Sequence, residues 1–269
     1  MSALYCLGEV WLTLSPAAGN LAQAELFHAQ AGGSVAALCA AYARLGGHAV
    51  LLAQLGDDAF GHRLKDTLAR DGIDISRIRF TREQHTPVFF ADATEHLAYH
   101  GAELGFPPEE LELSFLSDAS VLHFSSTALL DGPTRYTCLK AITSARESGI
   151  PVSFAPQLEP SLWQDESFLR QTFFHFLPLA DFVFLTENEL DFLFGSPELR
   201  TALFALFTGH VQFIGCTGAQ GTRILTRNVL KATEVPCSIE DLCAGILYQF
   251  SNSGLSREKL SRWKPELPV

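Results

Sequence analysis

The sequence predicts an α/β fold with a mainly parallel central sheet, because short strand-like runs alternate with helix-like runs along most of its 269 residues. Hydrophobic residues make up 47% and charged residues 18%, a balance that supports one large packed core. No internal repeat, low-complexity tract or linker rich in glycine or serine divides the chain. We therefore expect one domain, residues 1–269, built as a three-layer α/β/α sandwich with a small β lid.

Short apolar runs bounded by polar residues or glycine predict the strands. Residues 88–93 and 98–100 flank a polar turn and predict a hairpin. With the first strand-like segments, this hairpin places the lid strands within 10–30 and 86–102. Strands of the central sheet are expected at 4–7, 49–55, 121–124, 152–154, 182–185, 212–215 and 222–225.

Apolar side chains at helical spacing predict the helices between these strands. Leu64 and Leu68 are four residues apart in one such segment, and a helix that begins at Ser34 ends before Gly46, a natural stop. Eleven phenylalanines lie between residues 168 and 213. We interpret them as apolar core, with an exposed face used in self-association as the alternative. Helices are expected at 34–45, 61–71, 134–148, 167–177, 187–194, 197–207 and 238–250.

Charge and composition exclude several classes of partner. The net charge of −11 argues against nucleic acid, since affinity for a phosphate backbone comes largely from lysine and arginine. No segment reaches about 18 uninterrupted apolar residues, so we expect no membrane span. The N-terminus carries no positively charged leader. The six cysteines show no C-x-x-C spacing, which predicts a reduced, cytoplasmic protein.

Three glycine-containing motifs near the N-terminus identify a family. They are residues 31–37 (AGGSVAA), 43–47 (ARLGG) and 54–61 (QLGDDAFG). With this signature the chain resembles the ribokinase-like (PfkB) carbohydrate kinases, in their fructokinase or nucleoside-kinase branch, from Gly8 to about Phe250. The resemblance implies a ribokinase-like sandwich, transfer of the γ-phosphoryl group of ATP to a sugar hydroxyl, Mg²⁺ and ATP as cofactors, and a homodimer formed through the lid.

The resemblance also implies where a sugar would bind. Gly32 and Gly33 allow the backbone to approach a ligand and turn into the next helix. The family's asparagine, whose amide holds sugar hydroxyls, falls at Ala37, which has no donor or acceptor. The family's aspartate falls at Thr13, which can make a hydrogen bond but lacks the strength of a carboxylate.

A second substrate segment has changed at three polar positions. Residues 153–163 (SFAPQLEPSLW) resemble the family pattern Ser-Phe-Asp-x-Asn-x-Arg-x-x-Leu-Trp. Ala155 replaces the aspartate, Gln157 the asparagine and Glu159 the arginine. The last change reverses charge and would repel a polyphosphate. We favour a segment that now only connects a strand to a helix.

Two further motifs correspond to the family's magnesium and phosphate positions. Residues 186–189 (TENE) resemble Asn-x-x-Glu and place Glu189 at the magnesium, although the same spacing is a helix capping box, which we favour. Residues 216–221 (CTGAQG) resemble the Thr-x-Gly-Ala-x-Gly turn that contacts nucleotide phosphates. Gly218 and Gly221 keep that pattern while Cys216 departs from it, and a plain strand–turn–strand is the alternative.

Residues 234–247 (EVPCSIEDLCAGIL) stand where the family has Asp-Thr-Thr-Gly-Ala-Gly-Asp-Ala-Phe-x-Ala-Gly. The register places the catalytic base on Glu240, with Asp241 as an adjacent candidate. Ser238 stands inside the lost Gly-Ala-Gly, whose backbone amides would hold the transferring phosphoryl group. We favour Ser238 as an N-cap of an ordinary helix. The segment from Gly221 to residue 244 also looks too short for both a strand pair and a phosphate nest, and the 24 residues after Gly245 look too few for the helices that wall the family's adenine pocket.

Two functional hypotheses follow. The first is a degenerate family member, a pseudoenzyme that has lost or nearly lost phosphoryl transfer, needs no cofactor and binds a small sugar, a nucleoside or a partner protein. The second is an active carbohydrate kinase with Glu240 or Asp241 as an unusual base and Glu189 at the magnesium. His96 and His100 are four residues apart, but a hairpin with no third ligand argues against a metal site there.

Overall fold

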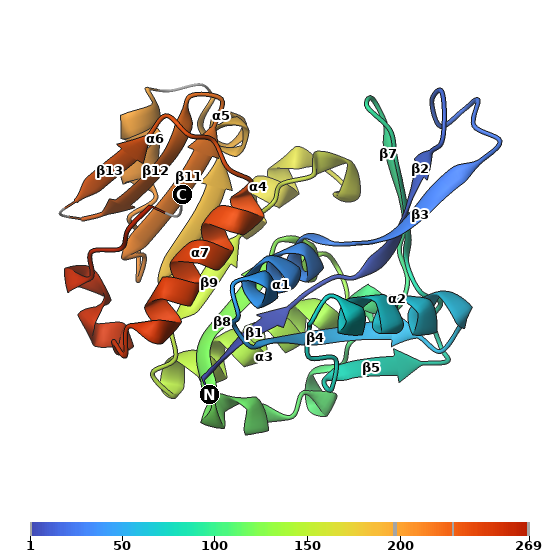
Figure 1. The fold of residues 1–269 in the computed structure, drawn as a ribbon, viewed down its shortest axis with the longest axis horizontal. Helices are drawn as coiled ribbons and strands as arrows, with labels where there is room; N and C mark the ends of the chain where they lie inside the picture. Colours follow the sequence, from blue (N-terminus) through green and yellow to red (C-terminus); the bar gives the residue numbers. More distant parts are fainter. Residues whose placement is uncertain (1, 196–197, 228, 268–269) are drawn as a thin grey trace.

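The computed structural model describes residues 2–195, 198–227 and 229–267. Within them, one nine-stranded sheet has the strand order β13-β12-β11-β10-β9-β8-β1-β4-β5 (Figure 1). Neighbouring strands from β11 to β5 run parallel, while β12 and β13 are added antiparallel at one end. The strands are β1 (Ala3–Leu7), β4 (Ala49–Gly56), β5 (Ile78–Thr81), β8 (Ala119–Ser125), β9 (Val152–Ala155), β10 (Phe182–Thr186), β11 (Phe213–Gly218), β12 (Gly221–Thr226) and β13 (Leu230–Thr233).

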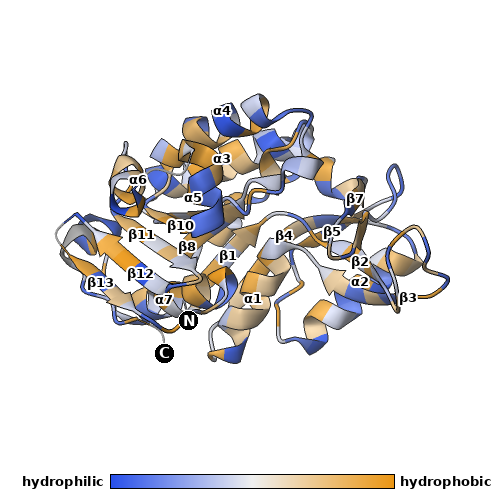
Figure 2. Ribbon diagram, turned by 90° about the horizontal axis from the view of Figure 1, so that it is seen from above, coloured by the Kyte–Doolittle hydropathy of each residue, from blue (hydrophilic) through white to orange (hydrophobic). Residues whose placement is uncertain are grey.

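Helices cover both faces of this sheet, so the predicted three-layer α/β/α class is confirmed. Figure 2 shows α3, α4, α5 and α6 on one side of the strands and α1, α2 and α7 on the other. The α-helices are α1 (Ser34–Arg44), α2 (Ala59–Arg70), α3 (Pro133–Glu147), α4 (Glu166–Phe176), α5 (Glu187–Phe194), α6 (Leu199–Ala205) and α7 (Ile239–Asn252). The 3-10 turns are η1 (Ala102–Leu104), η2 (Pro108–Glu110), η3 (Leu113–Ser117), η4 (Thr127–Leu129), η5 (Pro160–Leu162), η6 (Leu177–Leu179) and η7 (Arg257–Arg262).

Strand periodicity divides the interior into two cores. Successive side chains of a strand point to opposite faces. In β1, Leu4 and Cys6 therefore pack in the core beneath α1 and α7, whereas Tyr5 and Leu7 pack in the core beneath α3 and α4. Most of the phenylalanines between 168 and 213 belong to these two cores: five are buried, and four more are partly buried and pack against a core. Only Phe174 and Phe204 among the eleven are strongly exposed.

Four strands form the separate lid sheet in the order β3-β2-β6-β7. They are β2 (Trp11–Pro16), β3 (Phe27–Gly32), β6 (Val88–Ala91) and β7 (His96–Tyr99), and they extend away from the sandwich (Figure 1). One face of this sheet carries Trp11, Phe89 and His96, which line a cleft against the sandwich. The residues that alternate with them form the outer face.

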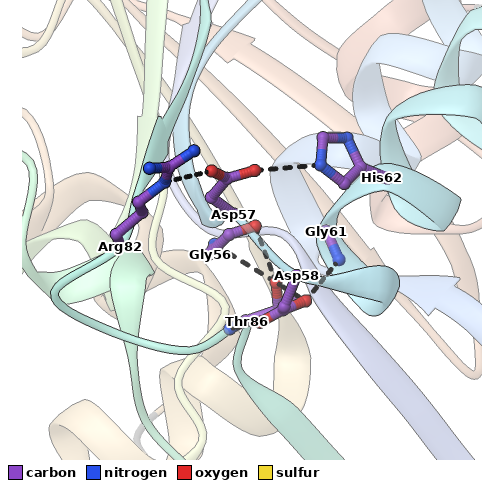
Figure 3. A network of polar contacts seen from close by, with 7 residues as sticks. All are labelled: Gly56, Asp57, Asp58, Gly61, His62, Arg82 and Thr86. Atoms are coloured by element: carbon purple, nitrogen blue, oxygen red, sulfur yellow. Dashed lines mark hydrogen bonds and ion pairs between the residues drawn. The ribbon is translucent and has the colours of Figure 1, made fainter.

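The turn after β4 anchors the lid at its root (Figure 3). Asp58 is the N-cap of α2 and accepts hydrogen bonds from Gly61 N at 2.8 Å and from Thr86 N and Thr86 Oγ1 at 2.8 and 2.9 Å. Although burial acts to raise it, these bonds lower the pKa of Asp58 overall. A Cβ at Gly61 would lie 2.1 Å from Gly56 O, so the turn requires glycine. The motif at 54–61 thus links the N-cap of α2 to the segment that leads into β6, the first strand of the lid hairpin.

The structure differs from the sequence predictions at two places. The strands β5 and β13 were not predicted, because both are short and only partly buried. The helix predicted at 197–207 is limited to Leu199–Ala205, and Pro197 lies outside the described residues. The segment 221–244, which we expected to be too short for both a strand pair and a phosphate nest, contains the strand pair of β12 and β13. Gly221, at φ +107°, allows the backbone around Thr233 to approach closely.

We predict a pH-dependent stability term from His123, which lies buried in β8 with Nδ1 3.0 Å from Ser153 Oγ. Burial lowers the pKa of His123 from 6.5 to about 3. The unfolded chain therefore takes up this proton first, and the free energy of unfolding should fall by about 2 kcal/mol between pH 7 and pH 5 from this group. Urea unfolding across that range should show the loss in the wild type and not in His123→Asn. The exposed His62→Asn is the matched control, and an unchanged pH dependence in His123→Asn would contradict the prediction.

Candidate functional site

A cleft of about 540 Å³ lies between the lid and the carboxyl ends of the central strands. Ligands of open α/β sheets bind at this edge, beyond the carboxyl ends of the strands. The cleft combines aromatic, hydroxyl, amide and carboxylate groups. Its lining residues are Glu9, Trp11, Ser34, Phe89, His96, Thr127, Gln157, Leu158, Glu159, Pro160, Leu162, Thr186, Asn188, Glu189, Phe192 and Ile239.

The lid contributes an aromatic wall. The rings of Trp11 and Phe89 are stacked, with centroids 4.9 Å apart and an interplanar angle of 19°. A Cβ at Gly32 would lie 2.7 Å from Trp11 Nε1 and 2.0 Å from Thr13 Oγ1, so only glycine lets both side chains pack there. Such a wall presents a flat apolar surface to a ring that has one apolar face.

The floor of the cleft is organised by Glu9, which the sequence analysis missed. Its side chain is 2% exposed, and its carboxylate accepts hydrogen bonds from Ser34 N, Ser34 Oγ and Ser125 Oγ. It therefore connects the glycine loop to the end of β8. Gly33, at φ +109°, is part of this arrangement, because a Cβ there would lie 2.5 Å from Glu9 O. An acidic residue directly after the first buried strand was the available signal.

The predicted sugar-side residues are only partly brought together. Gln157 lines the cleft, but Thr13 and Ala37 are not among its lining residues. The hydroxyl of Thr13 packs over Gly32, although Thr13 belongs to the cleft-facing side of the lid sheet. Ala37 is exposed on α1. Gln157 has a left-handed φ of +44°, and its Nε2 donates to Glu240 Oε1 at 2.8 Å.

Glu189 forms the capping box that its spacing predicted. Thr186 N and Thr186 Oγ1 donate to Glu189 Oε2, and Glu189 N donates to Thr186 Oγ1. The other oxygen, Oε1, accepts from Leu158 N at 2.7 Å. Burial raises the pKa of Glu189, and the nearby Glu240 adds to the rise while these hydrogen bonds oppose it. Because both oxygens are engaged inside the protein, the carboxylate fits a structural role better than a magnesium site.

The turn that corresponds to the family's phosphate contact is covered by an acidic side chain. A Cβ at Gly218 would lie 2.2 Å from the carboxylate carbon of Glu187, so that carboxylate lies directly over the glycine. Arg223 Nη1 lies 2.5 Å from Glu187 Oε1 and holds the carboxylate in this position. In the same turn, burial raises the pKa of Cys216 to about 12, so its thiol stays protonated. The turn therefore carries an ion pair of Glu187 and Arg223 beside Gly218.

Ser238 is the N-cap of α7 in the structure. Its Oγ accepts from Asp241 N at 3.0 Å and donates to Asp241 Oδ2 at 2.8 Å. Asp241 also pairs with the exposed Arg44. Of the two candidate bases, Glu240 therefore lies beside the cleft residue Gln157, whereas Asp241 is engaged in the cap.

The two lid histidines have separate carboxylate partners. His96 Nδ1 lies 2.8 Å from Glu159 Oε2, and His100 Nδ1 lies 2.7 Å from Glu103 Oε1. No group of three or more histidine, cysteine, aspartate or glutamate side chains in the described residues could hold a metal ion. Within the same residues, no helix is both long and apolar enough to cross a membrane.

Comparisons with known proteins agree with this architecture. The chain is 30% identical over 239 residues to probable fructokinase-4 of Arabidopsis thaliana, a match that covers 84% of this chain and 73% of the relative. It is 31% identical over 211 residues to the fructokinase of Klebsiella pneumoniae, covering 76% of this chain and 66% of that one. The chain spans 59% of the length of probable fructokinase-7 of Arabidopsis thaliana, at 30% identity and 72% coverage of this chain.

Solved structures show the same fold. The fructokinase of Xylella fastidiosa with bound ATP superposes with a TM-score of 0.83 at 27% identity, covering 97% of this chain and 84% of that one. A fructokinase double mutant of Vibrio cholerae, in its fructose-, ADP- and potassium-bound form, gives 0.84 at 26% identity, covering 94% and 85%. A protein-family model with the description "pfkB family carbohydrate kinase" matches residues 1–239 of this chain. By this match and its fructokinase relatives, the chain belongs to the PfkB family of carbohydrate kinases.

Proposed function

We propose that this chain binds a sugar or nucleoside in the cleft and that it transfers phosphoryl groups from ATP weakly or not at all. The observation that carries the proposal is the Glu187 carboxylate over Gly218, held by Arg223. A nucleotide phosphate at that turn would meet a negative charge at contact distance. Under this reading the protein needs neither ATP nor Mg²⁺.

The charge of the cleft supports the same proposal. Its ionisable lining residues in the described part of the chain are Glu9, Glu159, Glu189 and His96, with no lysine or arginine. Phosphoryl transfer depends almost wholly on positioning and on positive groups or backbone amides that stabilise charge. At the start of α7, Ser238 uses its side chain to cap one of those amides. Loss of one such donor typically costs on the order of 10²–10³ in rate.

The retained features favour binding of a small hydroxylated ring. The stacked Trp11 and Phe89 offer an apolar surface, and Ser34, Thr127 and Gln157 offer polar groups at the same cleft. A mainly apolar cleft with a few convergent polar groups is typical of a small-molecule site. The ligand class is therefore a sugar or a nucleoside.

One observation favours the second candidate, an active carbohydrate kinase. Gln157 Nε2 holds Glu240 Oε1 at 2.8 Å, so the residue at the family's base position lies at the edge of the cleft. An unusual glutamate base would accept the proton of a sugar hydroxyl from that place. The two candidates differ in nucleotide binding and in turnover.

We also propose a homodimer formed through the outer face of the lid. Leu14, Phe90 and Leu97 are in register across three strands of that face, and Val88 pairs with Tyr99 beside them. Leu97 and Tyr99 are exposed. A second copy of the chain would cover this apolar face symmetrically. The cysteines, all free in the structure, are consistent with a reducing, cytoplasmic setting.

Titration with Mg-ATP should separate the two functions. We expect weak binding by the wild type, with a dissociation constant above about 1 mM nucleotide. Glu187→Gln removes the charge over Gly218 and should raise nucleotide affinity by roughly threefold to tenfold, measured by displacement of a fluorescent analogue. Glu147→Gln on α3 removes an equal charge far from the turn and serves as control. Turnover of a sugar or nucleoside by the wild type, lost in Glu240→Gln and kept in Asp241→Asn, would instead establish the active kinase.

Sugar binding should depend on the aromatic wall. Replacing Trp11 by leucine removes the stacked ring, and we expect the affinity for the best ligand in a panel of ketoses, aldoses and nucleosides to fall about tenfold. Calorimetric titration measures the change. Leu97→Ala, on the opposite face of the lid, should leave the affinity unchanged. Equal affinities in the wild type and Trp11→Leu would contradict the proposed site.

The dimer should depend on the outer lid face. Tyr99→Lys places a charge on that face, and the dimer dissociation constant should rise at least about tenfold. Tyr136→Lys, at a residue of α3 that is 62% exposed against 59% for Tyr99, should have no effect. Sedimentation equilibrium measures both. A monomeric wild type, or a dimer unaffected by Tyr99→Lys, would reject this interface.

A further inference from the structure

Among the described residues, a polar pair joins the lid to the opposite wall of the cleft. His96 belongs to β7 in the lid, and Glu159 stands on the sandwich between β9 and η5. His96 Nδ1 and Glu159 Oε2 are 2.8 Å apart, and both residues line the cleft. The strand β7 contacts η5 at the same place.

Each partner is held in position from its own side. Glu159 Oε1 accepts hydrogen bonds from Ser161 N and Ser161 Oγ, so its other oxygen remains directed to the lid. The ring of His96 packs beside Phe89 at a centroid distance of 5.5 Å. Both side chains are thus held in place by neighbours on their own wall of the cleft. This reduces the side-chain entropy that is lost when the hydrogen bond between them forms.

The two ends of the lid are held with very different strength. At the root, Thr86 is buried and its backbone and side chain form hydrogen bonds with Asp58 and Gly56. At the far end, the side chains of His96 and Glu159 are 38% and 33% exposed, so water competes for their bond. A contact of this kind breaks far more readily than a buried one. The lid can therefore open at the cleft mouth while its root stays fixed.

We propose that the His96–Glu159 pair is a latch that closes the lid over the cleft and limits the rate at which a ligand enters and leaves. The latch acts on opening of the lid, so its loss should raise the association and dissociation rates of a ligand together. Lid opening governs exchange in this way in many enzymes with covered sites.

Hydrogen exchange tests the latch without a ligand. We expect the amides of β6 and β7 to exchange about threefold to tenfold faster in His96→Phe, which keeps the ring beside Phe89 and loses the bond. Glu159→Ala should match it, and the double variant should add nothing further. His48→Phe removes an exposed histidine–carboxylate pair with Asp74 that does not cross the cleft, and should leave lid exchange unchanged.

The core strands decide between a latch and a general stabilising contact. Amides of β1 and β4 should exchange at the wild-type rate in His96→Phe. Equal acceleration in lid and core, additive effects of the two variants, or unchanged lid exchange would each overturn the latch.

A second measurement uses Trp11 fluorescence to follow ligand binding in a stopped-flow instrument, with the best sugar or nucleoside from the panel. This arm rests on the proposed function. In His96→Phe the association rate and the dissociation rate should both rise about threefold to tenfold. A rise in only one of the two rates, or unaltered rates, would overturn the latch. If the wild type binds no ligand, the proposed function fails, and hydrogen exchange alone decides the latch.

Discussion

The cleft depends on one buried carboxylate. Glu9 follows the first central strand and binds three donors from Ser34 and Ser125, so it joins β1, the glycine loop and the end of β8. A buried carboxylate without such donors would be strongly unfavourable, which means that these three segments must keep their relative positions. The position of α1, and of the lid strands that enter through the glycine loop, follows from this contact.

The scaffold and the chemistry of this chain are largely independent. The two cores, one on each face of the sheet, are built mainly from buried strand and helix residues that do not line the cleft, and Ile239 is the exception. Glu189, Ser238 and Asp241 have local structural partners in the described residues, as parts of two helix caps. Polar groups that elsewhere in such a family serve a nucleotide can therefore be kept, exchanged or reused as caps without loss of the fold. This independence is consistent with the position of the Glu187 carboxylate beside Gly218, which the fold tolerates.

Much of the fold could be predicted from the sequence because the spacing of apolar residues within each segment indicates a strand or a helix. Apolar runs located most strands, and the Thr186 to Glu189 spacing indicated its capping box correctly. The edge strands β5 and β13 could not be found in this way, since they are short and only partly buried.

The candidate site was harder to predict, because its decisive contacts join distant segments. Glu187 contacts Gly218 and Arg223, and Gln157 contacts Glu240, although these residues lie far apart in the sequence. Residue spacing within one motif cannot predict such contacts. Motif register could name Glu240 as the base position, but it could not reveal which of Glu240 and Asp241 is taken up by the cap.

The backbone of Gln157 has a consequence for recognition. A non-glycine residue in the left-handed region stores about 1–3 kcal/mol of strain, which the surrounding contacts must hold in place. Here those contacts are the bond from its side chain to Glu240 and the bond from the next amide to Glu189. The floor under a bound molecule is therefore stiff, while the roof above it moves. The floor around Gln157 therefore selects ligands by their shape, whereas the lid sets only the rates at which a ligand enters and leaves.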